Sequence, residues 1–250
     1  MDEETRRKAL NRAKESLGSE AETERVLSKT VKQFDSIGNS LEERTESFRD
    51  WYSLYFPELE SEIEDDREFL KVLDRYGVRR KEIEPFQEMA ERSKGSELGD
   101  RELDLLEEEA SSLSEDLQYR GSLEDYIRET ARDEFPNLSA VLNPVLAARV
   151  VSLAGGLEEL ARKPASTVQM MGAEKALFRH LHGNGEPPKH GVLFKHEFVN
   201  SLPEDKRGKM ARFLANKAVL AARLDNYGEK DRASEYREEA SEKYRQLSEN

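Results

Sequence analysis

The chain has 250 residues, of which 36% are hydrophobic and 37% are charged, and its formal net charge is −13. The charged fraction exceeds the roughly 25% of ordinary globular domains, so one compact core is excluded and long helices with solvated faces are favoured. Cysteine is absent, which excludes a disulfide scaffold, a zinc–thiolate site and a cysteine nucleophile. No apolar run reaches about 18 residues and the start is acidic, so we expect an intracellular, cytoplasmic protein without a membrane span or secretory signal.

Residues 1–23 are predicted to form an N-terminal helical extension with few apolar anchors. Leu10 and Leu17 are spaced by seven residues, and Gly18 and Ser19 follow them. Glycine weakens a helix. We therefore expect the extension to break at Gly18 and to pack weakly.

A heptad pattern predicts one long helix over residues 19–56. Its seam is the series Leu27, Phe34, Leu41, Phe48 and Tyr55, and the companion series three residues later holds Thr30, Ile37 and Trp51, with Arg44 as the exception. Apolar residues that recur every seven positions line one face of a helix and are typical of coiled coils. Pro57 ends this helix or begins the next element.

A second seam follows short helices over residues 62–95 and a turn at 93–99. It consists of Leu103, Ala110 and Leu117 with the companions Leu106, Leu113 and Ile127, and Ser122 after Gly121 is expected to restart the helix. Two such seams predict an antiparallel coiled-coil hairpin over residues 24–135, with short helices at its tip. The same pattern also fits a coil between two chains, so it does not decide between monomer and dimer.

The composition changes at Pro136. Residues 136–229 are rich in small and apolar residues and are predicted to form a globular helical domain, followed by a polar helical tail over 230–250. The charge changes there as well: residues 1–136 carry 22 Lys and Arg against 38 Asp and Glu, whereas 137–228 carry 13 against 8 and all four histidines. Net acidity argues against nucleic acid as a partner, but this basic segment reopens that question.

Three basic segments are candidate nucleic-acid contacts. Gly172 and Ala173 are predicted to leave uncovered N–H groups at a helix start, and Lys175 and Arg179 share one face of that helix. Lys189 and His190 lie in a loop stiffened by two prolines, and Arg207, Lys209 and Arg212 form a basic stripe on the last apolar helix. The alternative interpretations are an amphipathic helix, a solvated turn and a solvated helix face.

The sequence gives weak support to catalysis. His180 and His182 are two residues apart, which points them to different sides of a helix and makes them a poor metal pair. Glu174 has no nucleophile or phosphate loop beside it. We therefore predict no metal, no cofactor and no catalytic residues.

Three stretches carry a resemblance to a known family. They are Arg49–Leu59, Pro136–Leu181 with the motifs KPAS and GAEKALFR, and Pro187–Glu229. Over residues 24–229 the chain resembles the Nop domain family, which includes the scaffold of box C/D guide ribonucleoproteins and a spliceosomal pre-mRNA-processing factor. The resemblance implies an all-α fold that combines a coiled-coil hairpin with a globular Nop domain and has no catalytic activity of its own.

The resemblance also implies partners and contact residues. The expected ligand is a kink-turn or box C/D-like RNA with a ribosomal-type kink-turn-binding protein already attached. The residues expected to face the RNA are Gly172, Ala173, Lys175, Arg179, Lys189, His190, Arg207, Lys209 and Arg212. Those expected to contact the protein partner are Gln169, Met170 and Glu174.

Two expectations concern architecture. The guide-particle scaffold carries an N-terminal domain that docks fibrillarin, and only about 23 residues precede the matched region here. The sequence therefore predicts a stand-alone archaeal Nop protein for which fibrillarin is not expected as a partner, and in which the coiled coil serves self-association. The rival hypothesis is a coiled-coil interaction or dimerisation module with a weak RNA surface, motivated by the acidic residues 1–136.

Overall fold

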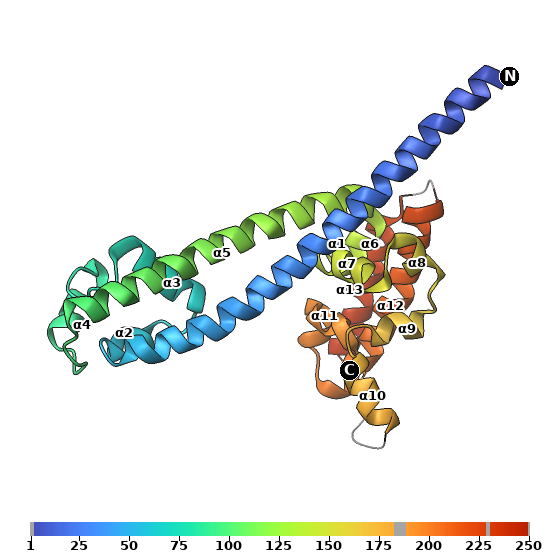
Figure 1. Ribbon diagram of the computed structural model, residues 1–250. Coiled ribbons are helices and arrows are strands. Elements are labelled where there is room, and N and C mark those ends of the chain that lie inside the picture. The colour runs from blue at the N-terminus through green and yellow to red at the C-terminus, as the bar shows by residue number, and fades with distance from the viewer. Residues whose placement is uncertain (1–2, 183–188, 229–230, 250) are drawn as a thin grey trace. The chain divides into compact units, whose positions relative to one another are not determined.

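The computed structural model of the protein describes residues 3–182, 189–228 and 231–249. Within these ranges the backbone is helical and contains no strand, so the predicted all-α class is confirmed (Figure 1). The first part of the chain forms α1 (Glu3–Ser53), α2 (Pro57–Glu62), α3 (Asp66–Tyr76), the 3-10 turn η1 (Glu84–Phe86), α4 (Gln87–Glu91) and α5 (Asp100–Glu134). The second part forms α6 (Pro136–Leu142), α7 (Pro144–Ala154), α8 (Leu157–Arg162), α9 (Ala165–Met170), α10 (Glu174–Leu181), η2 (Gly191–Lys195), α11 (Glu197–Asn200), α12 (Glu204–Tyr227) and α13 (Ala233–Ser248).

The chain divides into two compact units, and both long helices contribute to each. The hairpin unit is Gln33–Glu124, and the bundle unit combines Met1–Lys32 with Asp125–Asn250. This division differs from the predicted domain of residues 24–135, because Leu27, Ile127 and Phe135 are buried in the bundle unit. Both long helices continue across the boundary between the two units without a break. The heptad pattern therefore continues across the boundary as well, and it could not predict where one unit ends and the other begins.

In the hairpin unit, the segments of α1 and α5 are antiparallel. The guanidinium of Arg44 donates to Glu109 and Asp116 of α5 at 3.0 and 2.6 Å, and that of Arg120 lies 4.3 Å from the ring centre of Phe34. All predicted seam positions of α5 except the half-buried Leu117 are buried, as are the five from Leu27 to Tyr55, of which Tyr55 follows the end of α1. Of these positions, Leu27 and Ile127 lie in the bundle unit. Their shared burial confirms the two helix faces that the sequence pattern predicted.

The companion series of α1 differs from the prediction. Thr45 and Tyr52, four residues after Leu41 and Phe48, are buried, whereas Arg44 and Trp51 at the predicted positions are only half-buried. A heptad alternates spacings of three and four residues, so either neighbouring row satisfies the period. Tertiary packing selects the row that is buried: Tyr52 packs against the ring of Phe69 in α3, whereas Arg44 forms ion pairs with α5.

The predicted breaks at Gly18 and Gly121 are also absent. Both α1 and α5 continue through these glycines as uninterrupted helices. A glycine inside a helix costs only about 1 kcal/mol, and extending an existing helix is much easier than nucleating a new one. Each glycine therefore lowers the stability of its long helix locally without ending it.

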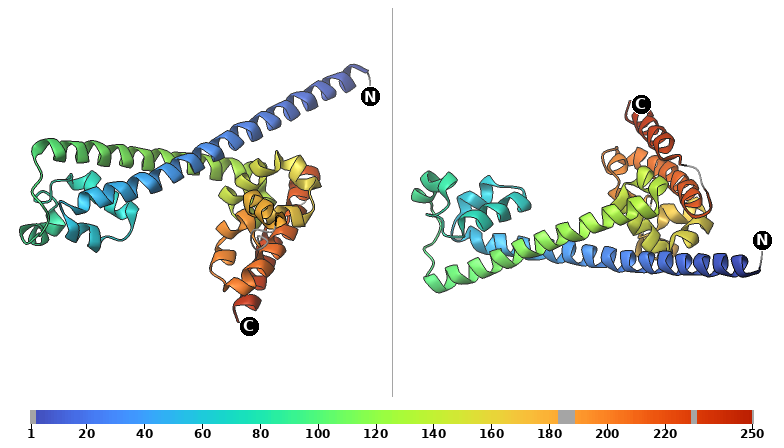
Figure 2. Two further views of the ribbon diagram at one scale, coloured as in Figure 1. Left: turned by 60° about the horizontal axis from the view of Figure 1, so that its bottom comes forward. Right: turned by 90° about the horizontal axis from the view of Figure 1, so that it is seen from above.

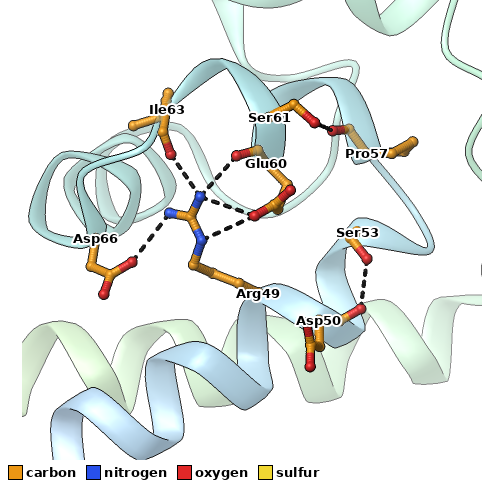
Figure 3. A network of polar contacts seen from close by, with 8 residues as sticks. All are labelled: Arg49, Asp50, Ser53, Pro57, Glu60, Ser61, Ile63 and Asp66. Atoms are coloured by element: carbon orange, nitrogen blue, oxygen red, sulfur yellow. Dashed lines mark hydrogen bonds and ion pairs between the residues drawn. The ribbon is translucent and has the colours of Figure 1, made fainter.

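Arg49 of α1 binds the end of α2 and the start of α3 through hydrogen bonds and ion pairs (Figure 3). Its guanidinium donates to the backbone carbonyls of Glu60 and Ile63 at 2.8 and 2.7 Å and pairs with the carboxylates of Glu60 and Asp66. It also lies 4.6 Å from the ring centre of Phe69. The carbonyls at the end of α2 have no partner within their own helix, and Arg49 supplies the missing donors.

The bundle unit is built around α12, which packs against α6, α8, α9 and α13 (Figure 1). Asp225 of α12 accepts hydrogen bonds from the backbone N–H groups of Asn137 and Leu138 at 3.0 and 2.8 Å and so caps α6. Burial raises the pKa of Asp225, and these hydrogen bonds partly oppose that effect. The cap therefore fixes the start of α6 against α12.

The predicted polar tail is part of the bundle. Tyr236 and Ala240 of α13 are buried, and Tyr244 stacks on Phe198 with ring centres 4.6 Å apart. Figure 2 shows α13 beside the other helices of this unit. The three residues are spaced by four and form one narrow apolar stripe, which a mostly polar composition conceals.

Among the described residues, no single helix is long and apolar enough to cross a membrane. The pair α6 and α7 meets that test only as two pieces bent by 111° at their junction.

Candidate nucleic-acid interface

The predicted contact residues converge on one part of the bundle unit, which we call the α9–α12 face: Gln169–Arg179, Lys189, His190 and Arg207–Arg212. The side-chain amide of Gln169 joins three of its segments, because its Nε2 lies 2.7 Å from the carbonyl oxygen of Lys189 and 3.5 Å from that of Gly208. The N–H of Val192 donates to the carbonyl of Met171 at 2.7 Å. Gln169 therefore organises the face internally, and its contact with a protein partner stays a prediction.

Two glycines allow the segments of this face to cross. Gly172 has φ +75° and Gly191 has φ +49°, a region that side chains with a Cβ rarely occupy. A Cβ at Gly191 would lie 2.4 Å from the carbonyl oxygen of Met171, and one at Gly172 would lie 3.1 Å from the Cβ of Val192. Only glycine at position 191 permits this approach of the two backbones.

The helix start at Gly172 is not open as predicted. The N–H of Gly172 donates to the carboxylate of Glu174 at 2.8 Å, and the N–H of Ala173 donates to the carbonyl of Met170 at 3.2 Å. Glu174 thus shields the turn that the sequence suggested would receive a phosphate, because its side chain folds back over the preceding backbone. Glu174 itself is exposed and Met170 is half-buried.

His190 and Arg207 share an aromatic partner that the sequence analysis had not singled out. The ring of His190 stacks on Phe194 with centres 4.9 Å apart, and the guanidinium of Arg207 lies 5.3 Å from the same ring. Burial lowers the pKa of His190, and the positive charges of Arg207 and Lys189 lower it further. His190 is therefore neutral at neutral pH and offers a flat ring together with a hydrogen-bonding nitrogen.

Arg207 is mainly a positioning residue. Its Nε donates to the carbonyl of Leu202 at 2.8 Å, and a terminal nitrogen donates to that of Asn200 at 3.3 Å. Lys189 extends an ammonium group to within 3.7 Å of Glu204. Both predicted cations are thus engaged within the face, which reduces what they offer to a ligand.

Four other predicted cations point into solvent. Lys175 and Arg179 on α10 and Lys209 and Arg212 on α12 are exposed, and none forms an ion pair within the described part of the chain. Phe178 lies between the two cations of α10, is 63% exposed and packs on His182 with ring centres 4.1 Å apart. The sequence analysis selected cations and therefore did not select Phe178. Its position three residues after Lys175 places it on the same helix face as Lys175 and Arg179, and this spacing could have identified it.

Other expectations fall outside this geometry. The loop residues 183–188, including both prolines predicted to stiffen the loop, lie outside the described residues. Within the described ranges, no group of three or more His, Asp or Glu side chains is arranged to hold a metal ion.

Comparison with known proteins places the sequence in a family. The profile of the Nop family, described as "snoRNA binding domain, fibrillarin", matches residues 33–246. An uncharacterized NOP5 family protein of Methanocaldococcus jannaschii is 36% identical over 219 residues, covering 82% of this chain and 53% of the relative. Nucleolar protein 58 of Schizosaccharomyces pombe is 33% identical over 219 residues, covering 82% of this chain and 43% of the relative.

Nucleolar protein 56 of Homo sapiens is 31% identical over 221 residues, covering 82% of this chain and 37% of the relative. The chain therefore spans about half or less of the length of these curated relatives. Among solved structures, a fibrillarin/Nop5p complex aligns with a TM-score of 0.48 and 23% identity, covering 98% of this chain and 80% of that chain.

These matches change two expectations. The family match extends to residue 246 and so includes most of α13, which had been assigned to a separate tail. The family description names fibrillarin beside snoRNA binding, which conflicts with the expectation that fibrillarin is an unlikely partner of this chain. With residues 33–246 matched by its profile, the chain belongs to the Nop family.

Proposed function

We propose that this chain is a non-enzymatic RNA-binding scaffold of ribonucleoprotein assembly that recognises a kink-turn RNA together with its bound kink-turn-binding protein. The observation that carries the proposal is the exposed row Lys175, Phe178 and Arg179 on one face of α10. Cations attract the phosphate backbone, and an exposed aromatic ring offers a stacking surface to an unpaired base. The family's description as a snoRNA-binding domain supports the same reading.

The architecture of the α9–α12 face supports a composite ligand. Some polar groups of the face form hydrogen bonds within the bundle unit, namely those of Gln169, Glu174 and Arg207. Others remain exposed, namely those of Lys209 and Arg212. A preorganised face loses less conformational entropy when it binds. It therefore suits a rigid preassembled RNA–protein surface.

The test is a fluorescence-anisotropy titration with a kink-turn RNA, with and without its kink-turn-binding protein. Replacing Lys175 and Arg179 by glutamine should weaken binding about tenfold or more at low salt and reduce the salt dependence of the affinity by between one and two powers of the salt concentration. The matched control is Arg67→Gln with Lys71→Gln on α3, which are also exposed and four residues apart. Equal affinities for the two double variants, or no binding by the unaltered protein, would refute the proposal.

A second candidate function is self-association through the hairpin unit. Leu105 of α5 is 48% exposed and borders a groove of about 710 Å³ that also contains the half-buried Trp51. Arg44, Glu108 and Glu109 rim the groove. Because a two-fold axis brings the same patch of both copies together, a rim with both signs of charge lets Arg44 of one copy meet Glu108 of the other, and we propose a second copy of the chain as the occupant. Analytical ultracentrifugation should show that Leu105→Lys is a monomer. The control variant Leu153→Lys, which changes an exposed leucine of the bundle unit, should remain self-associated.

A further inference from the structure

A second basic surface lies in the bundle unit, on elements that the sequence analysis did not single out. It is a groove of about 420 Å³ between the Glu24–Lys32 stretch of α1 and the junction of α7 with α8. We call it the α1 groove. Its lining includes three cations, two hydroxyls and two glycines, and it lies entirely within one unit.

Three cations form one row along the α1 side. Arg25, Lys29 and Lys32 are spaced by four and three residues, so they project from the same face of the helix, and all three are exposed. At 1.5 Å per residue the row extends about 10 Å along the helix axis. The net charge of the chain is −13, whereas the described residues that line the groove carry three cations against one acid, Glu24.

The acid that lines the groove does not neutralise this row. The carboxylate of Glu24 is directed at the start of α8, where it accepts a hydrogen bond from the N–H of Leu157 at 3.2 Å. Its other close neighbour there is Gly156, whose Cβ position lies 3.0 Å from the same oxygen. Glu24 thus helps to attach α1 to α8 and leaves the positive charge of the row in excess.

The floor of the groove offers a hydrogen-bond donor. The hydroxyls of Ser28 and Ser152 are 2.7 Å apart, so one of the two donates to the other. Each hydroxyl carries one proton, and only one of the two protons is used in this contact. Within the described part of the chain neither hydroxyl has a further hydrogen-bond partner, so the second proton is available to an anion in the groove.

The opposite wall admits a bulky ligand. A Cβ built at Gly155 would have no atom within 4 Å, and the wall residues of α7 and α8 at this point are uncharged. No carboxylate on that wall would repel a phosphate. The groove therefore combines a cationic edge, a donor on its floor and an open neutral edge.

We propose that the α1 groove binds the sugar-phosphate backbone of RNA, as a contact additional to the α9–α12 face; this inference rests on the proposed RNA-binding function. A polynucleotide carries a charge at every link, which matches a regular row of cations with a hydroxyl donor beneath it. An acidic peptide would need apolar pockets for its remaining side chains, and Val151 is the one aliphatic residue among the described residues that line the groove.

The two surfaces are separated along α12. Arg223 of α12 donates to the carbonyl of Ala161 in α8 at 2.9 Å, whereas the α9–α12 face is attached at Gly208. Fifteen residues of helix separate these two attachment points, which corresponds to about 22 Å. An RNA that enters the α9–α12 face therefore needs a flanking strand to reach the α1 groove.

The experiment compares two triple variants on three RNAs. The groove variant removes the row of cations and carries Arg25→Gln, Lys29→Gln and Lys32→Gln. The control variant removes the same amount of charge from α3 and carries Arg67→Gln, Lys71→Gln and Arg75→Gln. The probes are a minimal kink-turn RNA bound to its kink-turn-binding protein, the same complex with a ten-nucleotide uridine extension, and a twenty-nucleotide oligouridine alone. Anisotropy titrations over a series of salt concentrations give the affinity and its salt slope.

The groove variant should bind the extended complex and oligouridine about tenfold more weakly than the control variant. Its salt slope should be shallower by about 2, since each phosphate contact with a single strand contributes about 0.7. Its affinity for the minimal complex should be unchanged. The charge-retaining variant with Arg25→Lys, Lys29→Arg and Lys32→Arg should bind like the unaltered protein.

Other outcomes separate this inference from the proposed function. If the unaltered protein fails to bind the kink-turn complex, the proposed function fails, and selective loss of oligouridine binding in the groove variant would still support the groove. Equal binding by the two triple variants, or no oligouridine binding at low salt, would overturn the groove proposal. Competition by polyglutamate as effective as that by oligouridine would overturn the assignment to RNA.

Discussion

The hairpin unit and the bundle unit use the same charged residues for different purposes. The hairpin unit has 27 Asp and Glu against 12 Lys and Arg, a net charge of −15, whereas the bundle unit has a net charge of +2. In the hairpin unit, Arg44, Arg49, Arg79 and Arg80 are all paired with carboxylates. In the bundle unit, Lys175, Arg179, Lys209 and Arg212 remain exposed without such pairing among the described residues.

This difference shows why the net charge of the whole chain is a poor guide to its ligands. Salt screens exposed charges that are separated by more than about 10 Å, so a ligand responds to the charges near its own contact surface and not to the net charge of the whole chain. The paired cations of the hairpin unit stabilise structure, whereas Lys175, Arg179, Lys209 and Arg212 of the bundle unit are available to a ligand. Four predictions test that division, in order of decreasing effect.

The largest expected effect comes from removing Arg49 in the hairpin unit. Arg49→Met should lower the free energy of unfolding by about 3 kcal/mol, because two carbonyls and two carboxylates lose a donor in a largely desolvated position. Urea denaturation followed by circular dichroism measures the change. The control Arg67→Met, on the exposed side of α3, should change stability by less than about 0.5 kcal/mol. Equal effects for both would mean that the cations of the hairpin unit are not structural.

The next effect is on binding and belongs to the bundle unit. Phe178→Ala should weaken binding of the kink-turn complex by about 1–2 kcal/mol, the contribution of one base stacked on an aromatic ring. Thermal stability should stay the same, since the ring is mostly exposed. Tyr119→Ala, an exposed aromatic residue of the hairpin unit, should leave RNA affinity unchanged. A loss of affinity in both variants would contradict the separation of roles.

Acidification should destabilise the bundle unit through His196. Nε2 of His196 lies 3.1 Å from the carbonyl of Val141, and Nδ1 accepts from the N–H of Phe198 at 3.1 Å, so the neutral ring satisfies both partners. Burial lowers the pKa of His196 below the ordinary 6.5. A lowered pKa stabilises the fold above pH 6.5, and that contribution is lost as the pH falls through the lowered pKa.

His196→Gln should therefore lose less stability than the unaltered protein as the pH falls below about 6.5, the ordinary pKa of histidine. Thermal denaturation across this range measures it. His182→Gln, at an exposed histidine, should follow the unaltered protein. Parallel curves for all three proteins would show that the His196 hydrogen bonds do not control the pH response.

The smallest expected effect is a gain in stability in the hairpin unit. Gly121→Ala should stabilise α5 by about 0.5–1 kcal/mol, because the glycine is helical and an added Cβ would meet no atom within 4 Å. The midpoint of urea unfolding measures this gain. A neutral or destabilising result would indicate that the helix is interrupted at Gly121.

Much of the hairpin was predictable because the heptad periodicity of its long helices is a local property of the sequence. The row Leu103, Leu106 and Leu113 marks the buried face of α5 with no knowledge of its partner, since helical periodicity alone places these residues together. The choice between Arg44 and Thr45 on α1 was not predictable, because two rows fit the same period. The stripe of α13 was missed for a related reason: two buried residues in a polar sequence leave a weak signal.

The contact residues show a similar limit. Residue type and spacing located Lys175, Arg179, Lys209 and Arg212, and their RNA-binding role stays a prediction. Spacing could not reveal that Glu174 covers the N–H of Gly172 or that Gln169 bridges to Lys189 and Gly208. These contacts join residues whose side-chain directions depend on how loops cross, and sequence separation does not encode that crossing.

By itself, the sequence determined the helical class, the buried faces of the long helices, the change from an acidic to a basic segment, and the motifs of the Nop family. These features depend on periodicity and composition, which act within one helical turn or over one segment. The tertiary structure decided how α1 and α5 are divided between the two units, which row of α1 is buried, which cations are engaged, and that Arg25, Lys29 and Lys32 border a groove with the end of α7 and the α7–α8 junction. Each of these depends on contacts between residues far apart in the chain, which packing of the folded units selects and a local pattern cannot specify.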